Sequence, residues 1–128
     1  MPKISEILRD HRVLSVDAEQ TVIEAVRLMT EFNIGAVPVL RGGELIGIFS
    51  ERDLMRRVVA GARSPGVTKV SEVMTAKPKT ISADTEIDDC ITMMREAGFR
   101  HLPVVDEANK LRGVISLRDI MLRGRHQQ

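Results

Sequence analysis

Hydrophobic and polar positions follow a pattern that predicts the same elements twice along the chain. Apolar side chains recur at helical spacing between residues 21 and 32, and again between residues 87 and 97. Two apolar extended runs follow each stretch: AVPVL and ELIGIFS flank Gly42-Gly43, a two-residue hairpin signal, and HLPVV and KLRGVIS flank a longer turn. A second helix is predicted after each hairpin, from Glu51 to about Gly61 and from Leu117 to about Arg123.

The starts of the two long helices carry capping chemistry. Thr21-x-x-Glu24 and Thr85-x-x-Asp88 both fit a capping box. The two motifs are misaligned by one residue between the repeats, so the sequence does not fix the first residue of each helix. A short extended piece, around Ser15-Val16 or Thr80-Ile81, is predicted before each helix.

The chain is a tandem duplication. KISEIL from Lys3 aligns with KVSEVM from Lys69, and GIFSERDLMRR from Gly47 aligns with GVISLRDIMLR from Gly113, each at a shift of 66. Between them, IGAVPVL aligns with FRHLPVV at a shift of 65, and the extra residue falls in the turn, where insertions are tolerated. Motifs that agree in both order and spacing indicate an internal repeat.

Each repeat predicts an α+β unit, a three-stranded sheet with two helices. A unit of about 60 residues buries its apolar face poorly alone, so we expect two copies to pack about a pseudo-twofold axis. The expected boundaries are repeat 1 with its leader at 1–61, a Gly/Ser/Pro-marked linker at 62–68, repeat 2 at 69–124 and a tail at 125–128.

Composition excludes several classes of protein. A net charge of +1 and an aromatic content of 2% argue against a nucleic-acid surface, which needs a basic field or stacking rings. No run approaches the ~20 apolar residues of a membrane span, and the first ten residues, MPKISEILRD, are charged and lack the apolar core of a signal peptide. One cysteine excludes an intramolecular disulfide framework. We therefore expect a cytoplasmic protein with no membrane partner and no nucleic-acid partner.

The repeated motif with candidate chemistry is Ser-x-x-Asp, at Ser50–Asp53 and Ser116–Asp119. As a helix cap, the hydroxyl accepts from a free backbone N–H and the carboxylate complements the helix dipole. As a ligand site, the helix start attracts a phosphate, and the carboxylate accepts hydrogen bonds from the two hydroxyls of a ribose. The residues alone leave these two interpretations about even.

The ordered set of motifs resembles a stand-alone pair of CBS domains, a Bateman module, over roughly 13–59 and 78–124. The matching features are the helix ending before IGAVPV or FRHLPV, the Gly-containing second strand, and the Ser-x-x-Asp that opens the final helix. The resemblance implies a regulatory module that binds AMP, ADP, ATP, an NAD-type ligand or an S-adenosyl compound in clefts between the repeats. It also implies a homodimer and an unidentified regulated protein partner.

The resemblance also assigns roles to individual positions. Asp53 and Asp119 would hold the ribose hydroxyls. The candidates for phosphate contact are Ser50, Ser116, Arg100, His101, Arg52 and Arg118. The candidates for reading the adenine edge, largely through backbone groups, are Val16, Ala36, Val37, Pro38, Ile81, Leu102 and Pro103. Without aromatic rings in these stretches, the base would lie between aliphatic side chains.

The two repeats differ before their first hairpin strand. Repeat 2 has Arg100-His101 where repeat 1 has Gly35-Ala36. By the resemblance, a basic pair here reaches the phosphates of a nucleotide anchored by the other repeat, so we expect unequal clefts with Asp53 and Arg100/His101 in one site. The alternative is a solvated arginine beside a hydrogen-bonded histidine.

Catalytic chemistry is not expected. The histidines at 11, 101 and 126 lack paired zinc-site spacing, and Cys90 occupies the core position of Ala25, which favours a buried hydrophobe. No GxxxxGK loop appears. We expect no enzyme activity, no metal and no required cofactor, with AMP, ADP, ATP or NAD(H) as regulatory ligand. The alternative function is a structural or dimerisation module with empty clefts that binds a protein partner.

Overall fold

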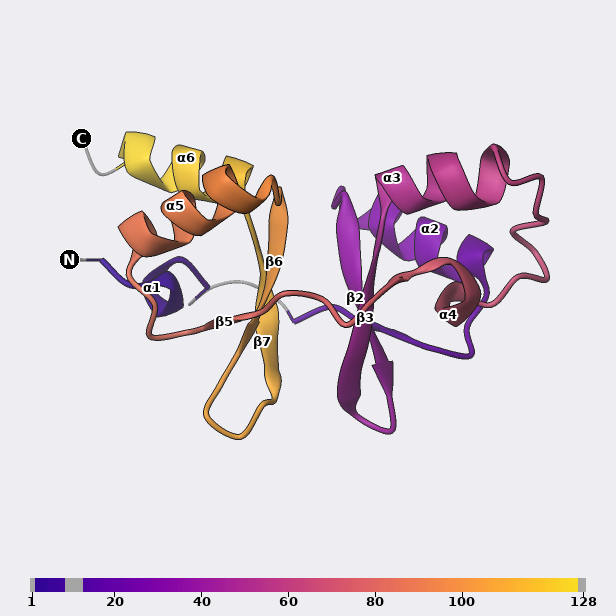
Figure 1. Ribbon diagram of the computed structural model, residues 1–128, viewed down its shortest axis with the longest axis horizontal. Coiled ribbons are helices and arrows are strands. Elements are labelled where there is room, and N and C mark those ends of the chain that lie inside the picture. The colour runs from indigo at the N-terminus through magenta and orange to yellow at the C-terminus, as the bar shows by residue number, and fades with distance from the viewer. Residues whose placement is uncertain (1, 9–12, 127–128) are drawn as a thin grey trace. The chain divides into compact units, whose positions relative to one another are not determined.

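The computed structural model describes residues 2–8 and 13–126, with side chains described up to Leu122. The predicted tail at 125–128 therefore lies mostly outside the described residues. The chain forms two compact units (Figure 1). The central unit is Leu14–Pro78, and the terminal unit combines Met1–Val13 with Lys79–Gln128. Each unit has its own sheet, helices and core.

The central unit contains a four-stranded mixed sheet in the order β1-β2-β3-β4. Strand β1 (Val16–Asp17) runs parallel to β2 (Ala36–Arg41), and β2 pairs antiparallel with β3 (Glu44–Ser50). The fourth strand, β4 (Thr75–Ala76), pairs antiparallel with β3. The sequence predicted three strands in each repeat, and β4 is an additional edge strand in this unit.

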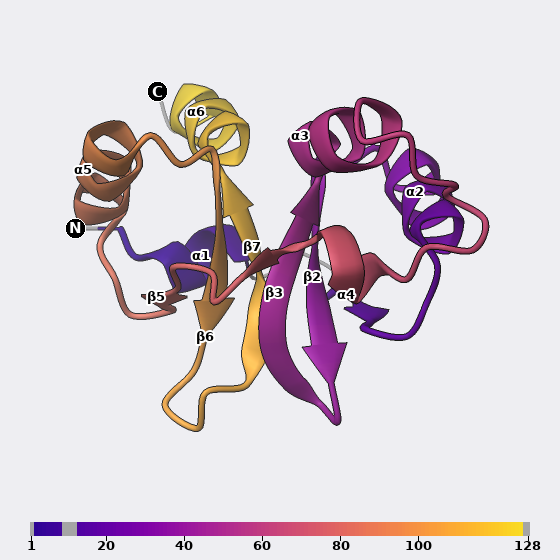
Figure 2. The same ribbon diagram turned by 45° about the vertical axis from the view of Figure 1, so that its right-hand side comes forward.

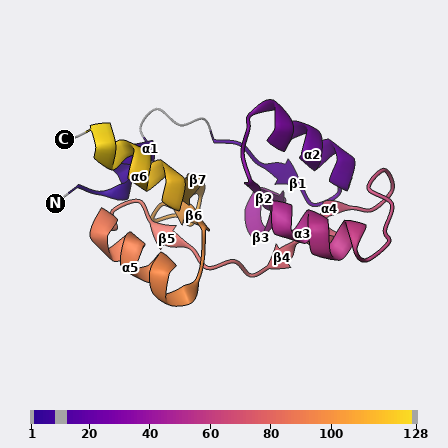
Figure 3. The same cartoon turned by 90° about the horizontal axis from the view of Figure 1, so that it is seen from above.

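The terminal unit contains the predicted three-stranded sheet, in the order β5-β6-β7. Strand β5 (Ile81–Ser82) runs parallel to β6 (His101–Val105), and β6 pairs antiparallel with β7 (Leu111–Ser116). The helices α5 (Ile87–Ala97) and α6 (Leu117–His126) lie next to one another in this unit (Figure 3). The element order of β5, α5, β6, β7 and α6 matches that of the central unit, as expected for an α+β duplication.

The two long helices begin differently. Helix α2 (Val22–Glu31) has the predicted capping box, in which Thr21 Oγ1 accepts from Glu24 N at 3.3 Å. Hydrogen bonds from Gln20 and then from Thr21 hold the pKa of the exposed Glu24 carboxyl below its ordinary value. The Thr85-x-x-Asp88 box is wrong, because α5 begins at Ile87 with Glu86 at its N-cap and no side-chain cap.

The hairpin turns explain the difference of one residue between the repeats. Gly42 and Gly43 have φ of 57° and 83°, the left-handed values that a tight two-residue hairpin requires. The longer turn between β6 and β7 is organised by Asp106, whose Oδ1 accepts from Ala108 N at 2.9 Å and from Lys110 N at 3.0 Å. The extra residue is therefore accommodated by a side-chain-supported loop.

The final helix of repeat 1 directly follows β3. It starts as α3 (Glu51–Asp53) and continues as the π-helix η1 (Leu54–Val59). The hydrogen bond from Ala60 N to Met55 O, at 2.9 Å, joins residues five positions apart, which is the spacing of a π-helix. The segment that follows η1 is hydrogen-bonded to the start of α2. The carbonyl of Thr68 accepts from Val22 N at 2.9 Å, and the carbonyl of Pro65 accepts from Ile23 N at 3.0 Å.

Each repeat is preceded by a short helix, here called its leader helix. Each leader helix packs in the unit formed by the other repeat. Helix α1 (Ile4–Leu8) precedes repeat 1 but packs in the terminal unit, beside β7 and α6 (Figure 2). Helix α4 (Val70–Val73), which precedes repeat 2, packs in the central unit. The physical reason is core filling: Ile4, Ile7 and Leu8 belong to the core of the terminal unit, and α4 supplies two buried valines to the other core.

This exchange also explains why a glycine stands at both Gly47 and Gly113. A Cβ built on Gly47 would lie 2.4 Å from Met74 Sδ and 2.9 Å from the carbonyl oxygen of Thr75. At Gly113 it would lie 3.3 Å from Leu8 Cδ2, a tight contact, and the backbone φ of 151° at this position also favours glycine. Leu8 and Met74 occupy matching positions in the two leaders, so each strand lacks a side chain where the end of a leader crosses it.

Candidate ligand-binding site

The first Ser-x-x-Asp motif joins β3 to α3. Ser50 is the N-cap, with extended backbone, and its Oγ accepts from Asp53 N at 3.3 Å. In return, Asp53 Oδ2 accepts from Ser50 N at 3.0 Å and from Ser50 Oγ at 3.1 Å. The predicted capping box is therefore present, and it fixes the position of the Asp53 carboxylate at the start of the helix.

Asp53 has two further partners that the sequence did not indicate. Thr75 Oγ1, on β4, lies 3.1 Å from Asp53 Oδ1, and Arg57 Nε lies 3.7 Å from the same oxygen. Arg57 in turn donates from Nη1 to the carbonyl of Met74 at 2.6 Å. Asp53 is 5% exposed, so this carboxylate is buried with an ion pair and hydrogen bonds that compensate its desolvation.

The second motif joins β7 to α6 and forms the same cap. Asp119 Oδ2 accepts from Ser116 N at 3.1 Å, and Ser116 Oγ accepts from Asp119 N at 3.0 Å. Asp119 is half-buried. Within the described side chains, its carboxylate has no partner except Ser116. Arg123, which matches Arg57 by sequence, lies outside the described side chains.

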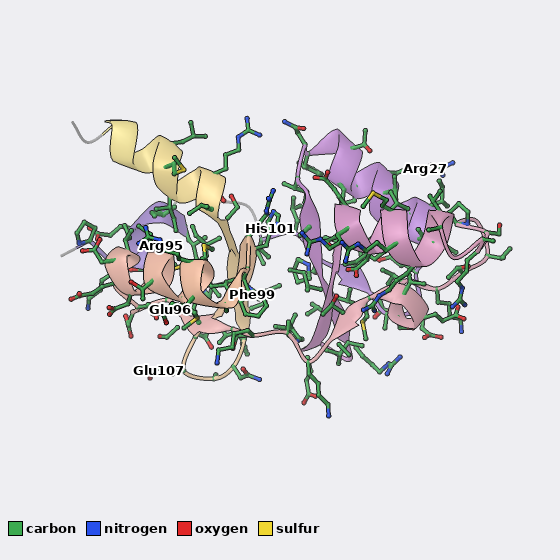
Figure 4. The ribbon with its side chains drawn as sticks, turned by 45° about the horizontal axis from the view of Figure 1, so that its top comes forward. Arg27, Arg95, Glu96, Phe99, His101 and Glu107 are labelled. Carbon is green, nitrogen blue, oxygen red and sulfur yellow. The ribbon has the colours of Figure 1, made fainter. Side chains whose placement is uncertain are left out.

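Pairing in the hairpins brings the residues before β2 and β6 next to the two caps. Ala36 is the register partner of Ser50, and His101 is the register partner of Ser116. The carbonyl of Arg100 accepts from Leu117 N, the first residue of α6, at 3.1 Å. The terminal unit thus carries an exposed arginine and a half-buried histidine beside its cap, and Figure 4 shows His101 at the start of β6.

The structure divides the predicted site residues into two matching sets, one in each unit. The central unit holds Ser50, Arg52, Asp53, Val16, Ala36, Val37 and Pro38. The terminal unit holds Ser116, Arg118, Asp119, Arg100, His101, Ile81, Leu102 and Pro103. Arg52 and Arg118 are exposed, whereas all seven predicted adenine-contact residues are buried.

The buried candidates limit how a base could be contacted. Val16 and Val37 belong to the core of the central unit, and Ile81 and Leu102 belong to the core of the terminal unit. These side chains are already packed against other apolar groups, so a base at these strands would be recognised by backbone groups at the strand ends.

A shallow groove in the central unit lies elsewhere. It runs along α2 and is lined by Ser15, Val16, Gln20, Glu24, Arg27, Leu28 and Glu31. Figure 4 shows Arg27 on this helix. Neither Ser-x-x-Asp motif contributes to the groove, Val16 is the one predicted site residue among those that line it, and its charged side chains are of mixed sign. It therefore does not extend the candidate site.

Other chemistry is limited in the described part of the chain. Cys90 is fully buried, and burial raises the pKa of its thiol above the ordinary value of 9.0, so the thiol is protonated and unreactive at neutral pH. Among the described residues, no three His, Cys, Asp or Glu side chains gather as a metal site would need. Within the same residues, no helix has the length and apolar character to cross a membrane.

The duplicated fold agrees with comparisons against known proteins. The family model for the CBS domain matches residues 4–60 and 70–125. This chain belongs to the CBS-domain family. It is 37% identical over 109 residues to CBS domain-containing protein YhcV of Bacillus subtilis (strain 168), covering 85% of this chain and 76% of that protein. It spans 52% of the longer CBSX3, mitochondrial, of Arabidopsis thaliana, at 34% identity over 80% of this chain.

Solved CBS structures have the same fold. A protein with CBS domains from Burkholderia ambifaria MC40-6 superposes with a TM-score of 0.91 at 36% identity, over 99% of this chain and 96% of that one. Two more distant CBS structures were solved with adenosine ligands. The CBS domain pair of protein MJ0100, with 5′-methylthioadenosine and S-adenosyl-L-methionine, has a TM-score of 0.88 at 21% identity and covers 100% of this chain and 99% of that one. CBSX2, with AMP, has a TM-score of 0.80 at 23% identity and covers 99% and 98%.

Proposed function

We propose that this CBS pair is a regulatory module that binds an adenosine nucleotide and catalyses no reaction. The observation that supports it best is the duplicated cap, in which a fixed carboxylate stands at the start of a helix in each unit. A ribose offers two hydroxyl donors to such a carboxylate, and the helix start favours the phosphate. The membership of the CBS family and the adenosine ligands of MJ0100 and CBSX2 agree with this choice.

The proposed roles follow the chemistry of each group. The carboxylates of Asp53 and Asp119 are the candidates for the ribose hydroxyls, and the hydroxyls of Ser50 and Ser116 lie at the phosphate end. The basic residues Arg52, Arg100, His101 and Arg118 are the candidates for phosphate contact. Beside its cap the terminal unit has the basic side chains of Arg100 and His101, at the place where the central unit has Gly35 and Ala36.

The proposed function predicts that adenosine ligands raise the melting temperature of the protein. The ligands to compare are AMP, ADP, ATP, NAD, NADH and S-adenosylmethionine, with GTP as the control. A ligand at 100 times its dissociation constant adds about 2.7 kcal/mol of stability, which corresponds to a shift of several degrees. The measurement is a thermal denaturation followed by circular dichroism. If none of the adenine ligands raises the melting temperature, the nucleotide function is refuted.

A second function, dimerisation and binding of a protein partner, is supported by exposed apolar side chains on both final helices. Met55 and Val59 lie one helical turn apart and are 59% and 72% exposed. Leu117 and Met121 lie one turn apart on α6 and are 38% and 57% exposed. Met55 and Met121 occupy matching positions in the two repeats. Apolar stripes of this kind are typical of surfaces that associate.

We expect the protein to be a homodimer through these stripes. The double variant Met55→Lys/Met121→Lys places two charges on the stripes and is expected to be monomeric, whereas the unsubstituted protein has twice the monomer mass. Light scattering after size-exclusion chromatography measures the difference. Glu51→Lys/Arg118→Glu is the matched control, because both positions are exposed and polar. A monomeric unsubstituted protein, or a dimeric Met55→Lys/Met121→Lys variant, would contradict the expectation.

A further inference from the structure

One segment of the central unit lies between two strained residues. Among the described residues, the non-glycine positions with positive φ are Asn33, Ala62, Lys77 and Asn109. Asparagine tolerates this left-handed conformation, whereas alanine and lysine carry a steric penalty there. Ala62 (φ 56°) directly precedes residues 63–76, which contain α4 and β4, and Lys77 (φ 51°) directly follows them. The two penalised residues therefore stand at the two ends of one segment.

We propose that residues 63–76 form a strap that detaches from the rest of the central unit as one piece, with Ala62 and Lys77 as its hinges. Figure 1 shows this segment leaving the helix labelled α3 and returning through α4. The strap is docked in the structure, and its opening is a local conformational change within one unit. The inference is independent of the proposed function, because it involves no ligand.

Lys77 is strained for a second reason. The next residue is Pro78, and a residue before proline favours extended backbone with negative φ. The hydrogen bond from Lys77 N to the carbonyl of Ile46 on β3, at 3.2 Å, fixes Lys77 in the left-handed conformation while the strap is docked. When the strap detaches, Lys77 and Ala62 both return to a favourable conformation. The strain at the two hinges therefore offsets part of the free energy of docking.

Hydrogen bonds within the strap hold it together. Arg63 Nη2 donates to Glu72 Oε1 at 2.6 Å, and Glu72 Oε2 accepts from Lys69 N at 2.8 Å. Within the loop before α4, Thr68 N donates to the carbonyl of Ser64 at 3.0 Å. These bonds connect the start of the strap to its helix, so the loop and α4 are expected to move as one piece.

The attachment of the strap to its unit is mostly exposed to solvent. Within the strap, only Thr68, Val70 and Val73 are buried. The strap bonds the start of α2 through backbone carbonyls, and its Lys69 pairs with Glu19 at 2.8 Å through side chains that are 51% and 61% exposed. Both residues of β4 are exposed. Few buried apolar contacts and exposed hydrogen bonds are typical of a segment that opens without unfolding the rest of its domain.

Opening of the strap changes the surroundings of the Asp53 cap. Thr75 on β4 donates from Oγ1 to Asp53 Oδ1 at 3.1 Å, and Arg57 donates to the carbonyl of Met74 at 2.6 Å. Thr75 and Met74 belong to the strap and leave with it, whereas Ser50 and Asp53 keep their own hydrogen bonds. The docking of the strap is therefore coupled to the environment of one candidate carboxylate.

The opening is tested by native-state hydrogen exchange of the full chain, measured for single amides by NMR at low, increasing urea concentrations. The amides of Val70 and Met74, which donate to the carbonyls of Gln20 and Val70, report on the strap. We expect their protection factors to be at least about tenfold lower than those of β2 and β3, and to depend less on urea. Equal protection with equal urea dependence would overturn the proposal, because the strap would then open only with the whole unit.

The hinges are tested with glycine, which adopts the left-handed conformation without a steric penalty. Ala62→Gly and Lys77→Gly relieve strain that exists only in the docked state, so each is expected to raise the protection of the strap amides about threefold to tenfold. Asn33→Gly is the matched control, because Asn33 has a φ of 53° but lies outside the strap. If either hinge variant raises the protection no more than Asn33→Gly does, that end is not a strained hinge and the proposal is overturned.

Discussion

The double variant Ile4→Ala/Ile7→Ala is expected to unfold the terminal unit, which contains the second repeat, rather than the first repeat that these residues precede. Ile4 is fully buried and Ile7 is 5% exposed in the core of the terminal unit. A buried Ile→Ala substitution costs about 2–5 kcal/mol, so the pair removes at least about 4 kcal/mol. That is much of the 5–15 kcal/mol that typically stabilises a domain.

Hydrogen exchange measured by mass spectrometry locates the effect. Peptides covering β6 and β7 should lose protection in the double variant, while peptides covering β2 and β3 keep it. Val70→Ala/Val73→Ala is the matched control, because these two valines are the corresponding core residues of α4 in the central unit. The control should reverse the pattern. Equal loss in both units, or loss confined to β2 and β3 in the isoleucine variant, would show that α1 does not belong to the terminal unit.

Phe49→Ala is expected to destabilise the central unit by about 3–5 kcal/mol. Among the described residues Phe49 is the largest fully buried side chain, with 0% of its surface exposed, and it packs within the core of that unit. Its replacement leaves a cavity that the neighbouring strands can fill only in part. The free energy of unfolding is measured by urea denaturation followed by circular dichroism, because the chain has no Trp or Tyr for fluorescence.

Phe99→Ala provides the control for this prediction, since it removes the same ring from a surface position. Phe99 is 40% exposed and lies between α5 and β6 (Figure 4). Its replacement should cost less than about 1 kcal/mol. A cost at Phe49 no greater than the cost at Phe99 would contradict the placement of Phe49 in the core.

Local features of the fold were predictable from the sequence. The capping boxes at Ser50 and Ser116 each connect residues three positions apart, so the sequence already contains both partners. The Gly42-Gly43 hairpin is local in the same sense, because the left-handed backbone of the turn favours glycine at both positions. At Thr85 the capping motif is misaligned by one residue with that of the first repeat, and the sequence did not locate the start of this helix.

Contacts between distant segments were not predictable from the sequence. Thr75 and Asp53 are 22 positions apart, and their hydrogen bond depends on β4, a strand of two residues with no periodic pattern of its own. The leaders KISEIL and KVSEVM have the same apolar spacing, so the pattern fits either core equally well. Only the packing of α1 against β7 and α6 shows which core each leader completes.

The placement of α1 affects folding during synthesis. Ile4–Leu8 emerges from the ribosome before the residues it packs against, because β7 and α6 come later in the chain than the whole central unit. The central unit, by contrast, has all its residues once Pro78 has been made. Domains generally fold as units, and those made earlier fold first. The central unit can therefore fold before the terminal unit has all its residues. Until then, the apolar face of α1 stays uncovered, available to a chaperone or to the same segment of another nascent chain.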